Sequence, residues 1–145
     1  MQQNAYSLWN GYGAPRLWWL RLFAVSCTGL SQFLLSAPFS WWPLHWVAWV
    51  PFFWAILSQE GRGRLFLGFW GGTLSNLCIF YWVLGALQDF GHVHWSLAIP
   101  LLGLMCAALS LLWIGLALGT FRLHERYPKH WHWLVPALLV SLEFL

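Results

Sequence analysis

Two carboxylates, Asp89 and Glu143, stand beside or within long apolar segments of this sequence. An ionisable group in such a position is a candidate functional site. Glu143 lies inside an apolar stretch, where an unpaired carboxylate is costly, so we expect a polar partner for it on another segment. Asp89 starts an Asp-Phe-Gly sequence in a polar connection, and the favoured alternative for it is a structural role in a turn.

The cysteines Cys27, Cys78 and Cys106 are the possible nucleophiles of the sequence. Each is surrounded by apolar residues with no basic neighbour that would lower the pKa of its thiol. Because free cysteine in such surroundings behaves as a small hydrophobic side chain, we expect all three to serve packing. They also fall in three separate apolar stretches, which argues against a disulfide framework. We therefore predict no catalytic residue in this sequence.

A His-x-His pair, His92 and His94, follows Asp89 closely and raises the question of a metal site. Imidazole and carboxylate are common metal ligands, but two histidines and one carboxylate in a short loop are a thin ligand set. We predict neither a metal nor any other cofactor.

Five apolar stretches must position these residues. At about 1.5 Å per residue, a helix needs some 20 residues to cross a hydrocarbon core of about 30 Å, and most of the stretches approach that length. The sequence therefore predicts an all-α, polytopic transmembrane helix bundle with spans at about 17–36, 41–58, 65–87, 96–121 and 133–145.

The basic residues all fall at alternate ends of these stretches. They are Arg16, Arg21, Arg62, Arg64, Arg122, Arg126 and Lys129. The connections 37–40 and 88–95 contain no Lys or Arg. This is the positive-inside pattern, so we expect a cytoplasmic N-terminus and a loop 88–95 on the opposite side of a bacterial inner membrane.

The composition agrees with this class: 60% of residues are apolar and 8% are charged, against roughly 25% charged in soluble domains. The net charge of +3 then reflects topology and gives no reason to expect a nucleic-acid partner. Residues 1–15 lack a basic region of the signal-peptide type, and we interpret residues 1–16 as a cytoplasmic tail before one transmembrane domain, 17–145.

Two stretches depart from a simple span. Pro51 falls inside the second stretch and predicts a short, kinked helix, with a re-entrant helix as the alternative. The fifth has only about 13 residues, which we interpret as a span truncated within the bilayer or covered by neighbouring helices.

Three motifs follow in order along these stretches. The first runs Pro-Phe-Ser-Trp-Trp-Pro-Leu-His-Trp-Val-Ala-Trp-Val-Pro from Pro38 to Pro51. The second is Tyr81-Trp82, then six residues, then Asp89-Phe90-Gly91; the third is the terminal Glu143-Phe144-Leu145. Together they resemble the N-terminal membrane domain of the apolipoprotein N-acyltransferase family. His92 departs from the family pattern, which usually has Gly there, and this limits the backbone at the tip of the loop.

The resemblance implies a role in bacterial lipoprotein maturation, in which an acyl chain passes from a phospholipid to the N-terminal cysteine of a lipoprotein. It also implies a nitrilase-like domain with a Glu-Lys-Cys set, and these residues hold no such domain. We thus expect the chain to be a membrane part that is inactive by itself, with membrane phospholipid and a diacylglyceryl lipoprotein as partners.

If this interpretation is right, Tyr81, Trp82 and the Asp89-Phe90-Gly91 turn should line the outer mouth of a hydrophobic groove, and Glu143 is a further candidate for binding. Seven residues separate Trp82 from Asp89, about two helical turns, so the two can share one face. The competing hypothesis is that Tyr81 and Trp82 are interfacial anchors only.

A second class of function is also open: a small, non-catalytic membrane protein that acts as a lipid-binding scaffold or assembly partner. A transporter is less favoured, since the sequence has no pair of charges in mid-membrane. Gly115 and Gly119 form a Gly-x-x-x-Gly sequence, which we attribute to close packing within one bundle; homodimerisation is an alternative, and the oligomeric state is not determined by the sequence.

Overall fold

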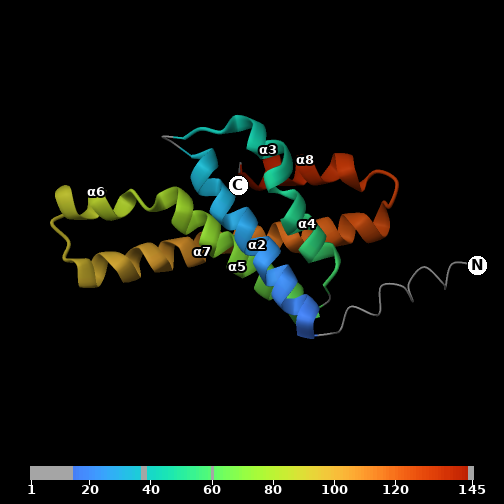
Figure 1. Ribbon diagram of the computed structural model, residues 1–145, viewed down its shortest axis with the longest axis horizontal. Coiled ribbons are helices and arrows are strands. Elements are labelled where there is room, and N and C mark those ends of the chain that lie inside the picture. Colours follow the sequence, from blue (N-terminus) through green and yellow to red (C-terminus); the bar gives the residue numbers. More distant parts are fainter. Residues whose placement is uncertain (1–14, 37–38, 60, 144–145) are drawn as a thin grey trace, which may run out of the picture.

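The computed structural model describes residues 15–36, 39–59 and 61–143 (Figure 1). Over these ranges the chain forms helices joined by short connections and contains no strand, which confirms the expected all-α class. Most of the predicted N-terminal tail, residues 1–14, lies outside the described residues, as do Phe144 and Leu145 at the end of the fifth stretch.

Each of the five stretches contains helix. The elements are α2 (Pro15–Leu35), the 3-10 turn η2 (Trp42–Leu44), α3 (His45–Ala48), α4 (Val50–Leu57), α5 (Gly61–Phe80), α6 (Val83–Asp89), α7 (Trp95–Arg126) and α8 (Trp131–Glu143).

Two stretches are broken. In the second, the chain turns at Trp49 between α3 and α4, and Pro51 occupies the first turn of α4. Proline suits that position because its missing N–H has no helical partner there, and the second stretch is interrupted close to Pro51, where the sequence predicted a kink. In the third, predicted as one span at 65–87, α5 and α6 meet at an angle of 51° across Tyr81 and Trp82. The third stretch is therefore bent, a feature that the sequence did not predict.

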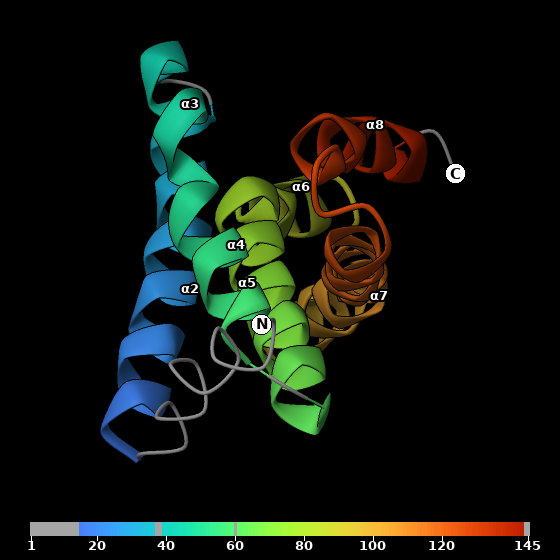
Figure 2. The ribbon, with the colours of Figure 1, turned by 90° about the vertical axis from the view of Figure 1, so that its right-hand side faces the viewer.

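Helix α5 lies between two groups of helices, with α2 and α4 on one side and α7 on the other (Figure 2). Its glycines allow the approach. A Cβ atom on Gly71 would lie 2.6 Å from Val25 of α2, and one on Gly72 would lie 2.7 Å from Cγ of Trp113 of α7. The buried core is built around this helix and comprises Val25, Phe52, Ala55, Ile56, Leu67, Leu116 and Ala117.

Hydroxyl groups add polar contacts to the same interface. The hydroxyls of Thr73 on α5 and Ser110 on α7 lie 2.8 Å apart, and Ser110 also donates to the carbonyl of Cys106 at 2.6 Å. Between helices in an apolar setting, such bonds satisfy groups that would otherwise be buried without partners. Small and polar side chains thus hold α5 and α7 together.

Helix α8 folds back over the C-terminal part of α7 (Figure 1). Here the Gly-x-x-x-Gly sequence faces α8: a Cβ on Gly115 would lie 3.8 Å from Leu142, and one on Gly119 would collide with the end of the Leu138 side chain. These contacts favour the interpretation of Gly115 and Gly119 as packing residues within one bundle.

Two arginines close the C-terminal end of α4. Arg64 Nε donates to the carbonyl of Ile56 at 3.1 Å, and Arg21 Nε donates to the hydroxyl of Ser58 at 3.2 Å. The Arg64 guanidinium also lies 3.3 Å from the ring centroid of Phe121 on α7. Positive charge is favourable at a helix C-terminus, where carbonyls lack partners. The sequence had indicated only a topological role for these two residues, yet both are buried.

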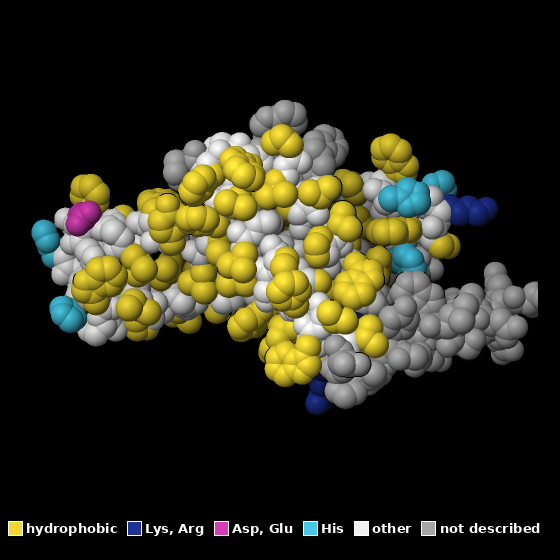
Figure 3. Space-filling view, in the orientation of Figure 1, with side chains coloured by type: hydrophobic (Ala, Val, Ile, Leu, Met, Phe, Trp, Pro, Cys, Tyr) yellow, Lys and Arg dark blue, Asp and Glu magenta, His cyan; other side chains and the backbone are white. Residues whose placement is uncertain are grey.

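The surface between the ends of the bundle is largely hydrophobic (Figure 3). Large apolar side chains there are widely exposed, among them Leu104, Phe23 and Trp19 at 70%, 69% and 68%. Basic side chains lie near the α7–α8 connection and the start of α2, whereas an acidic side chain and two histidines lie at the α6–α7 turn (Figure 3). An apolar surface of this extent marks contact with lipid or protein.

By length and hydropathy, α7 is long and apolar enough to cross a membrane, and α5 with α6 would form a second crossing if the bent pair counts as one span. Helix α8 is apolar but shorter. Among the described residues the number of such helices is therefore one or two, and the five-span pattern is not confirmed.

Candidate functional site

The residues predicted to line a groove lie at one end of the molecule, around α6. Tyr81 and Trp82 form the bend between α5 and α6, and Asp89 ends α6. Phe90 and Gly91 begin the turn to α7, and Phe90 is 87% exposed. Trp82 and Asp89 thus lie at the two ends of the short helix α6. Because of the bend, α6 does not continue in the direction of α5.

Tyr81 belongs to a small aromatic cluster that connects this end of the molecule to α2. Its ring centroid lies 5.5 Å from that of Phe33, which in turn lies 5.5 Å from that of Phe39. Tilted rings at this separation attract one another beyond simple burial. The cluster holds the end of α2 against the bend, while Trp82 remains 59% exposed.

Backbone hydrogen bonds close the α6–α7 turn: Phe90 N donates to Ala86 O at 3.1 Å and Val93 N donates to Leu87 O at 3.0 Å. His92 occupies the turn with φ of +49°, a left-handed conformation that favours glycine. His92 therefore does not change the conformation of the loop tip. It adopts the conformation that glycine would adopt there, at the cost of backbone strain.

His94 precedes α7 as its N-cap residue, with Nδ1 3.0 Å from the hydroxyl of Ser96. This contact gives His94 a structural role at the helix start. In the part of the chain that the structure describes, no group of three or more His, Cys, Asp or Glu residues is placed to hold a metal ion.

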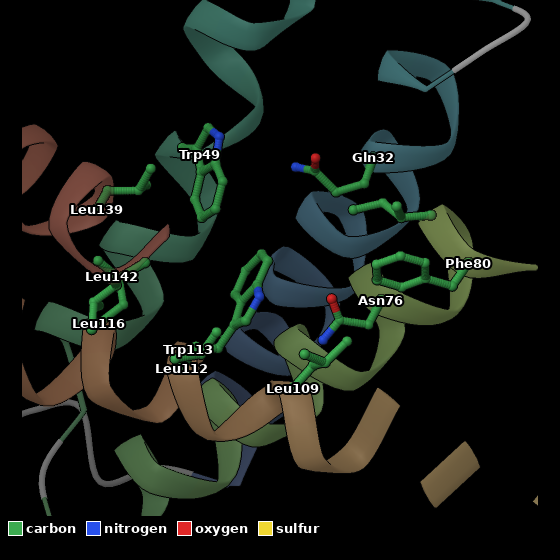
Figure 4. Close-up of a pocket in the computed structure, with 11 residues that line it drawn as sticks. Gln32, Trp49, Asn76, Phe80, Leu109, Leu112, Trp113, Leu116, Leu139 and Leu142 are labelled. Carbon is green, nitrogen blue, oxygen red and sulfur yellow. The ribbon is translucent and has the colours of Figure 1, made fainter. Parts of the chain in front are cut away.

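A cavity of about 360 Å³ lies deeper in the bundle, where α2, the α3–α4 junction, α5, α7 and α8 converge (Figure 4). Its walls are mostly apolar. They are formed by Gln32, Trp49, Asn76, Ile79, Phe80, Leu109, Leu112, Trp113, Leu116, Leu139 and Leu142. None of the five residues predicted for the groove lines this cavity, although Phe80 directly precedes Tyr81.

Two amide side chains line this cavity. Gln32 is 7% exposed and its Nε2 has no hydrogen-bond partner among the described residues. Asn76 Nδ2 donates to the carbonyl of Cys106 at a long 3.4 Å. Sequence reasoning missed both residues; the available signal was an amide side chain inside an otherwise apolar stretch.

Two tryptophans form the aromatic wall of the cavity. The rings of Trp49 and Trp113 stack at 4.9 Å between centroids, and Phe52 meets Trp113 edge-on at 5.2 Å. Contacts on two sides fix the orientation of the Trp113 ring. The cavity therefore has one rigid side.

The three cysteines and Glu143, the remaining candidates from the sequence, differ in their surroundings. Cys106 is fully buried, in agreement with a packing role, and Cys78 is half-buried. Cys27 is exposed on α2, so the expectation that all three would serve internal packing was wrong for this residue. The helix α8 extends to Glu143, but the side chain of Glu143 lies outside the described part of the structure.

The family model of the apolipoprotein N-acyltransferase N-terminal domain matches residues 28–145 of the chain. No curated protein matches the chain, and no solved structure does.

Proposed function

Because the chain belongs to the apolipoprotein N-acyltransferase family through its N-terminal domain, we propose that it serves as the membrane part of an enzyme that acylates lipoproteins. In this role the chain binds membrane phospholipid as acyl donor and presents the diacylglyceryl anchor of a bacterial lipoprotein. The observation that carries the proposal is the match of the family model over residues 28–145.

The topology proposed for this role has five spans in the bacterial inner membrane. Residues 1–16 form a cytoplasmic tail, residues 17–145 form the transmembrane domain, and the loop 88–95 faces the outer side. Support comes from the basic residues at alternate connections and from the broad apolar surface. The short, broken second stretch would cross as a kinked span, α3 followed by α4.

The outer mouth of the lipid site is proposed to lie at Tyr81, Trp82, Asp89, Phe90 and Gly91. The exposed rings of Trp82 and Phe90 offer an aromatic surface to acyl chains. The exposed Asp89 directly precedes Phe90, so its carboxylate is available to contact a polar headgroup. Glu143 is proposed as a further binding residue that needs a polar partner.

These residues have a binding role in the proposal and no catalytic one. Cys27, Cys78 and Cys106 lie on α2, α5 and α7, and none of them lies in the α6–α7 turn. The activated thiol that the family's covalent transfer requires must then come from a catalytic domain, and the chain by itself should not transfer acyl groups.

The test replaces Trp82 or Asp89 with Ala in a version that also carries the family's catalytic domain. We expect acyl transfer to a diacylglyceryl lipoprotein to fall about two- to tenfold, as for the loss of one contact to the substrate. Trp19, a similarly exposed tryptophan near the start of α2, provides the matched control, Trp19→Ala. Full activity of Trp82→Ala and Asp89→Ala at normal abundance would show that both residues are structural.

The second candidate is a non-catalytic membrane scaffold that binds lipid. The exposed apolar surface favours it as much as it favours the enzyme part. The two differ in the DNA downstream of codon 145. A continuing frame with a nitrilase-like Glu, Lys and Cys supports the enzyme, and a stop codon with normal expression supports the scaffold.

A further inference from the structure

The cavity between α2, α5, α7 and α8 has two chemically different sides (Figure 4). Gln32 and Asn76 bring their amides to one side from α2 and α5. Leucines of α7 and α8 form the opposite side: Leu116, Leu139 and Leu142. A cavity with one polar corner and a long apolar wall suits a molecule that is itself mostly apolar and carries one polar group.

The side chain of Gln32 indicates which kind of polar group the ligand carries. More than nine-tenths of the residue is buried, and its Nε2 is a donor without a partner among the described residues. Buried donors are nearly always paired, so an unpaired one at a cavity wall indicates a missing acceptor. An acceptor such as a carbonyl oxygen would fit. Neither amide carries a charge, which disfavours recognition of a phosphate or a cation at this corner.

The volume and the surroundings narrow the class of ligand. About 360 Å³ is near the lower end of the range for ligand sites, roughly 300–1,000 Å³, so the cavity has room for part of a lipid. The helices around it expose apolar side chains, such as Leu104 on α7 and Phe23 on α2, to the surroundings. In a membrane, acyl chains are the molecules that surround such helices.

We propose that the cavity binds one acyl chain of an ester-linked membrane lipid, with the ester carbonyl accepting a hydrogen bond from Gln32. The chain lies along the leucines of α7 and α8, against the stacked rings of Trp49 and Trp113. This inference rests on the proposed membrane location. It concerns a site distinct from the exposed residues at the α6–α7 turn, because none of those lines the cavity.

Ester and ether phospholipids provide the test, since an ether lipid has the same chains but no carbonyl. The full chain is reconstituted in bilayers with a phospholipid that carries a photoreactive group at the end of one acyl chain. Crosslinks are expected at Leu109, Leu139 or Leu142. Unlabelled ester lipid should compete about two- to tenfold better than ether lipid with the same chains, the preference expected from one hydrogen bond.

Three variants sharpen the result. Gln32→Leu should abolish the preference for ester lipid, and Leu109→Phe should reduce crosslinking by filling the cavity. Gln88→Leu is the matched control: Gln88 on α6 also has an unpaired Nε2 but does not line the cavity, so its replacement should preserve the preference. If Gln32→Leu does not fold, the comparison of ester and ether lipids in the unmodified protein still decides.

The proposal is overturned if crosslinks map only to outward-facing residues, if ester and ether lipids compete equally, or if Gln32→Leu keeps the preference. Its failure is distinguishable from failure of the proposed function, because acyl transfer in the Trp82→Ala and Asp89→Ala variants is measured independently.

Discussion

Replacing Gly72 with Ala tests the packing of α5 against α7 at a single atom. The added Cβ would lie 2.7 Å from Cγ and 2.8 Å from Cβ of Trp113. These atoms are near the backbone, and the ring beyond them is held by Trp49 and Phe52. The side chain therefore cannot rotate away cheaply, and the two helices must separate slightly.

The expected magnitude follows from two opposing terms. Overpacking a filled interior costs about 1–3 kcal/mol. Ala in place of Gly in a helix gains about 1 kcal/mol. Gly72→Ala should therefore lower the free energy of unfolding by about 0–2 kcal/mol.

Gly103→Ala isolates the packing term. Gly103 also lies inside a helix, α7, but a Cβ there meets nothing within 4 Å. This variant should gain the helix term alone, so the two variants should differ by about 1–3 kcal/mol. For a chain of this size that is a difference of roughly 3–10 °C in Tm.

Thermal unfolding of the purified protein in detergent, followed by size-exclusion chromatography, measures the difference. Gly119→Ala should fall between the two, because its Cβ meets only the flexible end of Leu138. Equal melting of Gly72→Ala and Gly103→Ala would refute the proposed contact between α5 and α7.

Three further predictions follow from other features. With the native cysteines replaced, a cysteine at Phe90 should react with a membrane-impermeant thiol reagent in intact cells and one at Tyr127 should not; the reverse pattern would contradict the topology. Arg64→Met should destabilise the protein by about 1–3 kcal/mol in thermal unfolding, because Ile56 O loses its charged donor; the exposed Arg62→Met is the control, and equal melting would argue against the capping role. His92→Gly should raise stability by up to about 1 kcal/mol by relieving the positive φ, and a lower Tm would show that the histidine side chain contributes more than its strain costs.

The all-helical class could be predicted, and so could the approximate positions of the long helices, because long apolar stretches and the loops between them are local properties. The predicted first stretch, 17–36, and fourth, 96–121, correspond to α2 and α7. The break at Pro51 was also predictable, since proline acts on its own helix. The bend at Tyr81 was not, because neither Tyr nor Trp breaks a helix; there the chain contacts Phe33, almost 50 residues earlier in the sequence.

The cavity could not be predicted from the sequence for a similar reason. Gln32 and Asn76 lie far apart along the chain, and only the packing of α2 against α5 brings them to one wall. Arg21 and Arg64 show the same limit. Their positions were interpreted as topology signals, but their contacts with Ser58 and Ile56 depend on where α4 ends in space.

The central place of α5 has a consequence for biogenesis. Small and polar residues of α5 suit a helix that is enclosed by neighbouring helices; they are Gly71, Gly72, Thr73, Ser75 and Asn76. The same residues make exposure of this side of α5 to lipid unfavourable. Helices α2 and α4 precede α5 during synthesis, but the residues of α7 that cover its other side emerge later. In the proposed topology, the polar side of α5 therefore stays uncovered in the membrane until α7 has been inserted. Substitutions on α7 that delay this contact should reduce how much protein survives insertion, before any effect on the finished fold can be measured.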